Sequence, residues 1–464
     1  MSNALMVDFG STYTKIVVVN LETEQVIWTG QAPTTVENIM NGLNEALNQL
    51  RHDVGPMDFK YKLACSSAAG GLRMVAVGFV KELTVEAARS SALGAGAKVL
   101  DVFSYGLDDL DMEKIISIKP DIILLAGGTD GGDKNILIQN VELIARSPLE
   151  IPIILAGNRK AAKKAGEILR NGGKDIIITE NVMPDLNVLN VEPARKAIRE
   201  VFMRRIVSAK GLDKAQSFIG RILMPTPMAV LNAAELLAEG TNEEEGIGDL
   251  IIVDVGGATT DIHSIAQGNP AGNAFLKGLP EPYSKRTVEG DLGIRYNAPN
   301  ILEMCGEEQI LNNAGLSKNL SKDLLDYIEL ISSVIDKVPS NELEVKFDLG
   351  LARTAVEIAI RRHAGTIEEV YFPDGLIYIQ IGKDLTNLKT VIATGGIFIH
   401  SAHGFEVLQG ITFNLKDPFS LRPKSPEFYI DEKYSLFAFG LLAEASPNAA
   451  LRLAKKDLKK FIST

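Results

Sequence analysis

The sequence is poor in the residues that build disulfide-bonded or metal-bound folds. Its 464 residues include two cysteines, five histidines and one tryptophan. Two cysteines are too few for a disulfide framework. The sequence has no H-x-x-x-H or C-x-x-C spacing, so it gives no indication of a zinc site. Hydrophobic residues make up 46% of the chain, so we expect folding through an ordinary apolar core.

Basic charge and long apolar runs are also lacking. The net charge of −11 and the pI near 5.2 argue against a nucleic-acid partner, because phosphate backbones are bound by basic surfaces. No run of 18 apolar residues occurs, and the start lacks the basic-then-apolar pattern of a signal peptide. We therefore expect a soluble, cytoplasmic α/β protein without membrane contact, and at this length two or three domains.

Two segments about 240 residues apart follow one pattern. In each, an apolar run ends in an aspartate, Asp8 or Asp254, and glycines, hydroxyl residues and a second strand follow. Such hairpin tips bring backbone N–H and hydroxyl donors to a polyphosphate, and each aspartate can orient a water of bound Mg²⁺. The candidate nucleotide-binding residues are Gly10, Ser11, Thr12, Thr14 and Lys15 in the first segment and Gly256, Gly257, Ala258, Thr259 and Thr260 in the second.

Three further segments complete this pattern. Residues 388–396 read as a buried strand that ends in Gly395 and Gly396, where the backbone can lie against a flat adenosine. Residues 222–231 and 434–442 are apolar and rich in small residues, and we predict that both are packed connecting helices.

The order of these elements resembles that of the actin, heat-shock chaperone and sugar kinase superfamily of ATPases. The resemblance implies an α/β fold with two lobes, each built on a ribonuclease-H-like domain, and ATP with Mg²⁺ as cofactors. It also makes Asp8, Asp254 and Glu289 the candidate catalytic residues. For Glu289 and Asp291, which lie in an acid-rich segment, helix capping is the alternative interpretation.

Strands and helices alternate between these elements, which predicts an inserted, doubly wound α/β domain. Its strands are expected near residues 61–65, 99–103, 121–125, 151–155 and 175–179. The predicted domains are residues 1–55 (first part of lobe I), 56–210 (the insert), 211–245 (connecting helix of lobe I), 246–430 (lobe II, with a helical embellishment near 300–346) and 431–464 (C-terminal connecting helix returning to lobe I).

The insert contains a glycine-rich turn, residues 127–132, between an apolar strand and a helix. Such a turn suits an anion, but four glycines in one turn also serve tight packing. Both interpretations stay open from the sequence.

Segments 7–15, 125–132, 254–264, 287–295 and 393–396 together resemble the glutamate-mutase-associated MutL-type proteins, a family unrelated to the mismatch-repair proteins of that name. The resemblance implies an ATP-dependent chaperone or reactivating factor for adenosylcobalamin-dependent mutases, such as glutamate mutase or ornithine aminomutase. Mutase subunits are then the partners, and cobalamin is met only through them.

Met224 departs from the chaperone pattern, because heat-shock chaperones place a glutamate before the corresponding Pro-Thr. We therefore expect ATP hydrolysis to be slow or stimulated by a partner. The alternatives are a small-molecule kinase of the same superfamily, a hydantoinase-type ATPase and an actin-like scaffold.

Overall fold

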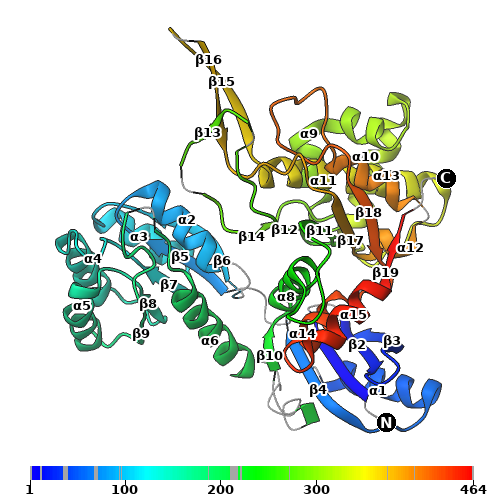
Figure 1. Ribbon diagram of the computed structural model, residues 1–464, viewed down its shortest axis with the longest axis horizontal. Coiled ribbons are helices and arrows are strands. Elements are labelled where there is room, and N and C mark those ends of the chain that lie inside the picture. The colour runs from blue at the N-terminus through cyan, green and yellow to red at the C-terminus, as the bar shows by residue number, and fades with distance from the viewer. Residues whose placement is uncertain are drawn as a thin grey trace. The chain divides into compact units, whose positions relative to one another are not determined.

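The computed structural model describes residues 3–10, 13–34, 40–66, 72–92, 95, 97–186, 188–208, 218–219, 222–270, 272–278, 280–373, 375–401 and 403–461. The chain divides into two compact units, Met1–Val230 and Leu231–Thr464 (Figure 1). Within the described residues, no helix combines the length and the apolar character needed to cross a bilayer.

Unit 1 contains a five-stranded sheet in the order β10-β4-β1-β2-β3. The central strand β1 pairs antiparallel with β2 and parallel with β4, and β4 pairs parallel with β10. Helix α1 (Met40–Val54) covers one face with a buried stripe of leucines and alanine. The strands are β1 (Asn3–Phe9), β2 (Tyr13–Asn20), β3 (Gln25–Pro33), β4 (Phe59–Ser66) and β10 (Ile222–Pro225).

The insert lies between β4 and β10 in the sequence and forms a second, all-parallel sheet in the order β6-β5-β7-β8-β9. This is the predicted doubly wound domain. Its strands are β5 (Leu72–Val77), β6 (Ala97–Phe103), β7 (Ile122–Leu125), β8 (Ile153–Leu155) and β9 (Ile176–Ile178), and its helices are α2 (Lys81–Ala92), α3 (Asp109–Ile118), α4 (Asn135–Arg146), α5 (Arg159–Asn171) and α6 (Glu192–Ser208).

Two predictions of secondary-structure elements around the insert are wrong. The strand predicted at 61–65 belongs to the lobe sheet as β4, and the first strand of the insert is β5, which the sequence analysis missed. Residues Ile222–Pro225, predicted to be helical, form strand β10, and helix α8 begins only at Thr226 (Thr226–Glu239). Pro225 explains the second error, because the residue before a proline is driven out of the helical region.

Unit 2 repeats the first sheet. Its six strands have the order β14-β12-β11-β17-β18-β19, and the first five match β3-β2-β1-β4-β10 in order and direction. The strands are β11 (Leu250–Val255), β12 (Thr260–Ile265), β14 (Ser284–Glu289), β17 (Thr390–Thr394), β18 (Glu427–Asp431) and β19 (Leu458–Lys460). A ribonuclease-H-like domain is thus duplicated, one in each unit, which confirms the predicted actin-like ATPase fold.

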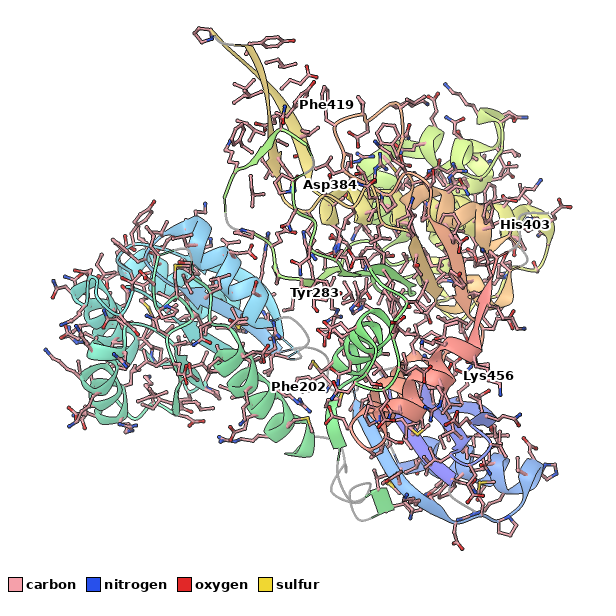
Figure 2. All side chains as sticks on the ribbon, in the orientation of Figure 1. Phe202, Tyr283, Asp384, His403, Phe419 and Lys456 are labelled. Atoms are coloured by element: carbon pink, nitrogen blue, oxygen red, sulfur yellow. The ribbon has the colours of Figure 1, made fainter. Side chains whose placement is uncertain are left out.

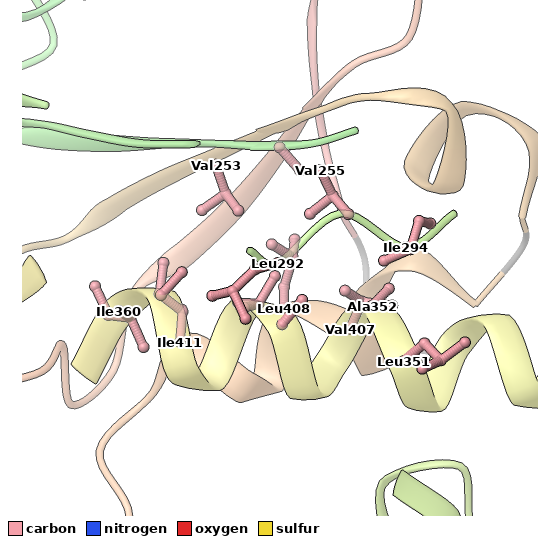
Figure 3. Close-up of a cluster of buried hydrophobic side chains, with 14 of the residues drawn as sticks. Val253, Val255, Leu292, Ile294, Leu351, Ala352, Ile360, Val407, Leu408 and Ile411 are labelled. Atoms are coloured by element: carbon pink, nitrogen blue, oxygen red, sulfur yellow. The ribbon is translucent and has the colours of Figure 1, made fainter. Parts of the chain in front are cut away.

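Helices surround the second sheet. The 22-residue α11 (Glu342–His363) packs along one face, and its Leu351, Ala352 and Ile360 belong to the same buried apolar cluster as Val253 and Val255 of β11 (Figure 3). The helical region predicted near 300–346 comprises α9, η1 and α10. The other helices of unit 2 follow β14 or lie near the C-terminus: α9 (Ala298–Asn313), η1 (Lys318–Leu320), α10 (Ser321–Ser333), α12 (Gly396–His400), α13 (Gly404–Leu408), η2 (Gln409–Ile411), α14 (Leu436–Ala443) and α15 (Pro447–Asp457).

A buried polar network fixes α11 against the sheet. His363, at the end of α11, hydrogen-bonds through Nε2 to Ser264 Oγ of β12 (2.8 Å) and through Nδ1 to Thr287 Oγ1 of β14 (3.0 Å). Lys383, whose side chain is 1% exposed, donates to the Tyr283 carbonyl (2.7 Å) and to Ser264 Oγ (3.4 Å). Burial, with the nearby positive charge of Lys285, lowers the pKa of Lys383 to about 7.

The substitution Lys383→Met should change how stability depends on pH. An unfolded lysine keeps its ordinary pKa, so above about pH 7 the unfolded chain binds a proton that the folded protein has released. The wild-type free energy of unfolding should therefore rise from pH 7 towards pH 9, by at most about 1.4 kcal/mol per pH unit. Urea unfolding at several pH values should show this rise in the wild type and its loss in the variant, and equal slopes would contradict the assignment.

Candidate functional site

Asp8 and Asp254 occupy the same place in the two repeated sheets. Each lies near the carboxyl end of the central strand, on the face opposite the main apolar core. That core contains Leu5, Val7 and Phe9 in unit 1 and Ile251, Val253 and Val255 in unit 2. Because side chains alternate along a strand, both aspartates face away from these clusters. The predicted equivalence of the two hairpins is therefore also an equivalence of sheet position.

The Asp8 carboxylate is held by residues of helix α8 and strand β4 in unit 1. Thr226 Oγ1, at the first residue of α8, donates to Asp8 Oδ1 over 2.5 Å, and the Cys65 thiol of β4 lies 3.6 Å from the same oxygen. Asp8 is 3% exposed. This burial raises its pKa above the ordinary value, and the charge of Lys15 and the bonds from Thr226 and Cys65 oppose the shift.

Lys15 lies on the same sheet face as Asp8, because the two residues are directly paired between β1 and β2. The corresponding pair in unit 2 is Asp254 with Asp261. There a second acid replaces the lysine, and Arg286 of β14 forms an ion pair with Asp261 at 2.7 Å. The two sites thus differ in local charge.

Asp254 is approached by Tyr434 and by Gly395, both within unit 2. The Tyr434 hydroxyl lies 3.5 Å from Asp254 Oδ2. Gly395 has a φ of +115°, and a Cβ atom there would lie 2.4 Å from the Val255 carbonyl and 3.2 Å from Asp254 Oδ1. Only glycine fits this approach, so the glycine pair predicted from the sequence lies beside the second aspartate. Gly396 begins the short helix α12.

The two hairpin tips close with the same hydrogen bond. The N–H of Gly10 donates to the carbonyl of Tyr13 (3.1 Å), and that of Gly256 donates to the carbonyl of Thr259 (2.9 Å). In the second tip the carbonyls of Gly256, Gly257 and Ala258 accept bonds from residues 294–297. Gly257 and Ala258 donate no backbone hydrogen bond to any residue that the structure describes, so their N–H groups are available to an anion. Ser11 and Thr12 lie outside the described residues.

Comparison of the sequence with known proteins decides the family. The family model described as "MutL protein" matches residues 4–458. Protein MutL of Clostridium tetanomorphum is 50% identical over 467 residues, an alignment that covers 99% of this chain and 100% of that relative. The chain belongs to the MutL family.

Solved structures are more distant from this MutL-family chain. A diol dehydratase-reactivating factor in nucleotide-free form is 11% identical, with a TM-score of 0.36 over 96% of this chain and 99% of that one. The gluconate kinase of Lactobacillus acidophilus is 10% identical, with a TM-score of 0.34 over 99% and 93%. At these low scores neither likeness decides the fold, which rests on the repeated strand order.

The structure does not bring the hydroxyls of Thr14 and Thr260 to the hairpin tips. Both residues are fully buried on the core face: Thr14 Oγ1 meets Thr34 Oγ1 at 3.1 Å, and Thr260 Oγ1 donates to the Leu292 carbonyl at 2.7 Å. Their register with Phe9 and Val255 gives the reason, since paired residues share a face. In this conformation their buried hydrogen bonds stabilise the ends of the hairpins, and neither hydroxyl is exposed at a tip.

Glu289 does not join Asp254 in the structure. It pairs with Thr260 between β12 and β14, which puts it on the face covered by α11. There Arg362 of α11 forms an ion pair with Glu289 and with Asp291, at 3.0 Å from the latter. Burial raises the pKa of Glu289, and Arg362 opposes that shift. This ion pair is a structural role that the sequence analysis did not foresee.

Thr226 and Tyr434 are the contacts to the aspartates that sequence reasoning missed. Thr226 follows β10 and Tyr434 follows β18, and these strands occupy equivalent places in the two sheets. The signal available in the sequence was their place in the two predicted connecting helices, since Thr226 lies within residues 222–231 and Tyr434 begins residues 434–442.

The glycine-rich turn of the insert is held by two buried asparagines. Asn158 donates to the Thr129 carbonyl (2.5 Å), and Asn181 donates to the Gly128 carbonyl (2.9 Å) and to Asp130 Oδ1 (3.0 Å). The Arg159 N–H also donates to Asp130 (2.9 Å). Asp130 therefore ties the turn to the start of α5, which agrees with the packing interpretation for this residue. A ligand role for the turn stays a prediction.

Removing the Thr226 hydroxyl should destabilise the apoprotein. In Thr226→Val the buried Asp8 carboxylate loses its shortest donor, so the free energy of unfolding should fall by about 1–3 kcal/mol. Thr226→Ser keeps the hydroxyl and serves as the control. Urea unfolding at pH 7 measures both variants, and a Val variant as stable as the Ser variant would show that the bond contributes nothing.

Proposed function

We propose that this MutL-family chain is a cytoplasmic, ATP-binding reactivating factor for an adenosylcobalamin-dependent mutase of the glutamate mutase or ornithine aminomutase type. The observation that carries the nucleotide part is the repeated hairpin with an aspartate on the sheet face opposite the apolar core, Asp8 in unit 1 and Asp254 in unit 2. Membership of the MutL family supports the mutase part. Damaged cobalamin is then released from the mutase rather than used by this chain.

The residues around the hairpins fit the chemistry of a metal–nucleotide complex. Asp8 and Asp254 would hold waters of Mg²⁺, and the N–H groups of Gly257 and Ala258 would bind phosphate oxygens. Lys15, on the same face as Asp8, adds a positive charge. A bound nucleotide would supply the differential binding free energy that favours one conformation of the protein over another.

We further propose that hydrolysis is slow until a mutase binds. Met224 is fully buried and has no acid–base group. Glu289 is engaged by Arg362, so in this conformation it is not free to orient a water. Asp8 stays the candidate residue for orienting the attacking water. Burial raises its pKa, so the protonated form is more populated than in an exposed aspartate.

Nucleotide affinity should depend on both aspartates. Asp8→Asn or Asp254→Asn should weaken Mg²⁺-dependent ATP binding at least tenfold, which is about 1.4 kcal/mol, because a charge-assisted contact to the hydrated metal is lost. Isothermal titration with ATP, with Mg²⁺ or with EDTA, measures this effect. Asp109→Asn, which changes an exposed acid of α3, is the matched control. Unchanged affinities in both site variants would refute the proposed nucleotide site.

The turn 127–132 provides a test of the insert. If this edge of the sheet contacts the mutase, changing Thr129 and Asp130 to alanine should abolish reactivation of a cobalamin-inactivated mutase and leave ATP binding intact. Loss of both activities together would assign the turn to the folding core or to the nucleotide site. Retention of both would leave it a packing turn.

Phosphate release separates this proposal from a small-molecule kinase. A reactivating factor should release phosphate from ATP faster when its mutase is added, without phosphorylating a small acceptor. Release that depends on a sugar or another hydroxyl substrate, and not on the mutase, would favour the kinase.

A further inference from the structure

Unit 2 carries a β-ribbon that lies outside the repeated sheet. Strands β15 (Thr366–Phe372) and β16 (Gly375–Ile381) form a hairpin, and β13 (Ala274–Leu276) pairs with β16 to make a separate three-stranded sheet. The hairpin extends well beyond the other elements of unit 2, and the end of β15 and the start of β16 form its tip (Figure 1). The duplicated nucleotide fold does not need such an element.

Large apolar side chains lie exposed along this ribbon. Tyr371, next to the tip, is 78% exposed, its partner Leu376 is 40% exposed, and Phe275 of β13 is 64% exposed. Exposed aromatic and aliphatic groups gathered on one projecting element are typical of protein–protein contact sites.

Both faces of the ribbon carry apolar side chains, together with one glutamate each, Glu369 on one face and Glu368 on the other. Tyr371 pairs with Leu376 and therefore shares one face with it, and Glu369 and Tyr378 continue that face. Val370 pairs with Ile377 on the other face, where Phe275 lies opposite Ile379. A strand added to the edge of β15 would place its side chains alternately on both faces, so the pattern fits an extended partner segment that carries apolar residues.

The outer edge of β15 is open to a further strand. The Ile367 N–H points away from β16 and donates to the carbonyl of Phe419 (2.9 Å), which lies beside the base of the ribbon (Figure 2). Because the pattern alternates, the backbone groups of Glu369 and Tyr371 also point outward. Beyond the Thr366–Ser420 bridge, no strand of the described chain pairs with β15 on that side. An extended segment of a partner can add there.

Charge argues against a second copy of this chain as the partner. Residues 368–379 contain three acids, Glu368, Glu369 and Asp374, and no lysine or arginine. An antiparallel pairing of β15 with another β15 about its centre would bring glutamates opposite each other, which destabilises a strand pair. The chemistry instead fits a partner segment in which lysine or arginine alternates with apolar residues.

We propose that the β15–β16 ribbon is the docking element for the mutase, and that it binds an extended, basic and apolar segment of a mutase subunit. This assignment of the partner rests on the proposed function. Apolar contacts at Tyr371 and Leu376 provide the affinity, and Glu368 and Glu369 select basic partners.

The double variant Tyr371→Ser/Leu376→Ser tests the ribbon. Purified glutamate mutase and ornithine aminomutase subunits, immobilised separately, are titrated with the full chain by biolayer interferometry. We expect the wild type to bind one of the mutases and the double variant to bind it at least tenfold more weakly. Val338→Ser removes an equally exposed apolar side chain of unit 2 (75% exposed) and should bind as the wild type does. ATP affinity, measured in parallel, shows that the variant is folded.

Glu368→Lys/Glu369→Lys tests the charge argument and should also weaken binding, most strongly at low salt. If the wild type and the Tyr371→Ser/Leu376→Ser variant bind the mutase equally, the ribbon proposal is overturned and the proposed function stands. If the wild type binds neither mutase, the docking proposal fails together with the function on which it rests. Sedimentation that shows a wild-type dimer abolished by the double variant would assign the ribbon to self-association and overturn the proposal.

Discussion

The hydrogen bond from Thr226 to Asp8 depends on the topology of the whole first unit. The two residues are 218 positions apart, and they meet because β4 pairs with β1 and β10 pairs with β4. The insert leaves the lobe sheet after β4 and returns to it at β10, which is the adjacent strand. A complete doubly wound domain is thereby accommodated without separating the aspartate from its donor.

The repeat in unit 2 uses the same sheet positions with different chemistry. Tyr434, which follows β18, replaces Thr226 as the hydroxyl near the aspartate. Asp261, balanced by Arg286, replaces Lys15 across the hairpin. An acid buried without full compensation keeps its pKa raised, as Asp8 does, and a cation brought by a ligand relieves that cost. The two hairpins are thus equivalent in their sheet position and distinct in charge.

Around this duplicated core, α11 connects the second sheet to its helical layer through charged and polar groups. His363 joins β12 to β14, and the neighbouring Arg362 holds Glu289 and Asp291. Burial holds the pKa of His363 well below its usual range, so this histidine is neutral. The hydrogen bonds of His363 and the ion pairs of Arg362 therefore depend on the same end of α11. A shift of α11 would therefore move β14 and its acids together. Only two residues separate the end of α11 at His363 from the start of the β15–β16 ribbon at Thr366, so the ribbon is attached directly to this part of the unit.

The sequence by itself determined the local motifs and the fold class. Asp8, Asp254 and Gly395 were identifiable because a strand end, a glycine and a hydroxyl cluster are short-range patterns, and their repetition indicated a duplicated ATPase fold. The inward orientation of Thr14 and Thr260 was also encoded, since the alternation of β2 and β12 puts them on the core face. Only the tertiary structure decided which strand belongs to which sheet, as with β4, because apolar strands read alike before they pair. It alone joined Thr226 to Asp8, Tyr434 to Asp254 and Arg362 to Glu289, since contacts between distant residues depend on strand order and helix packing, which no local pattern specifies.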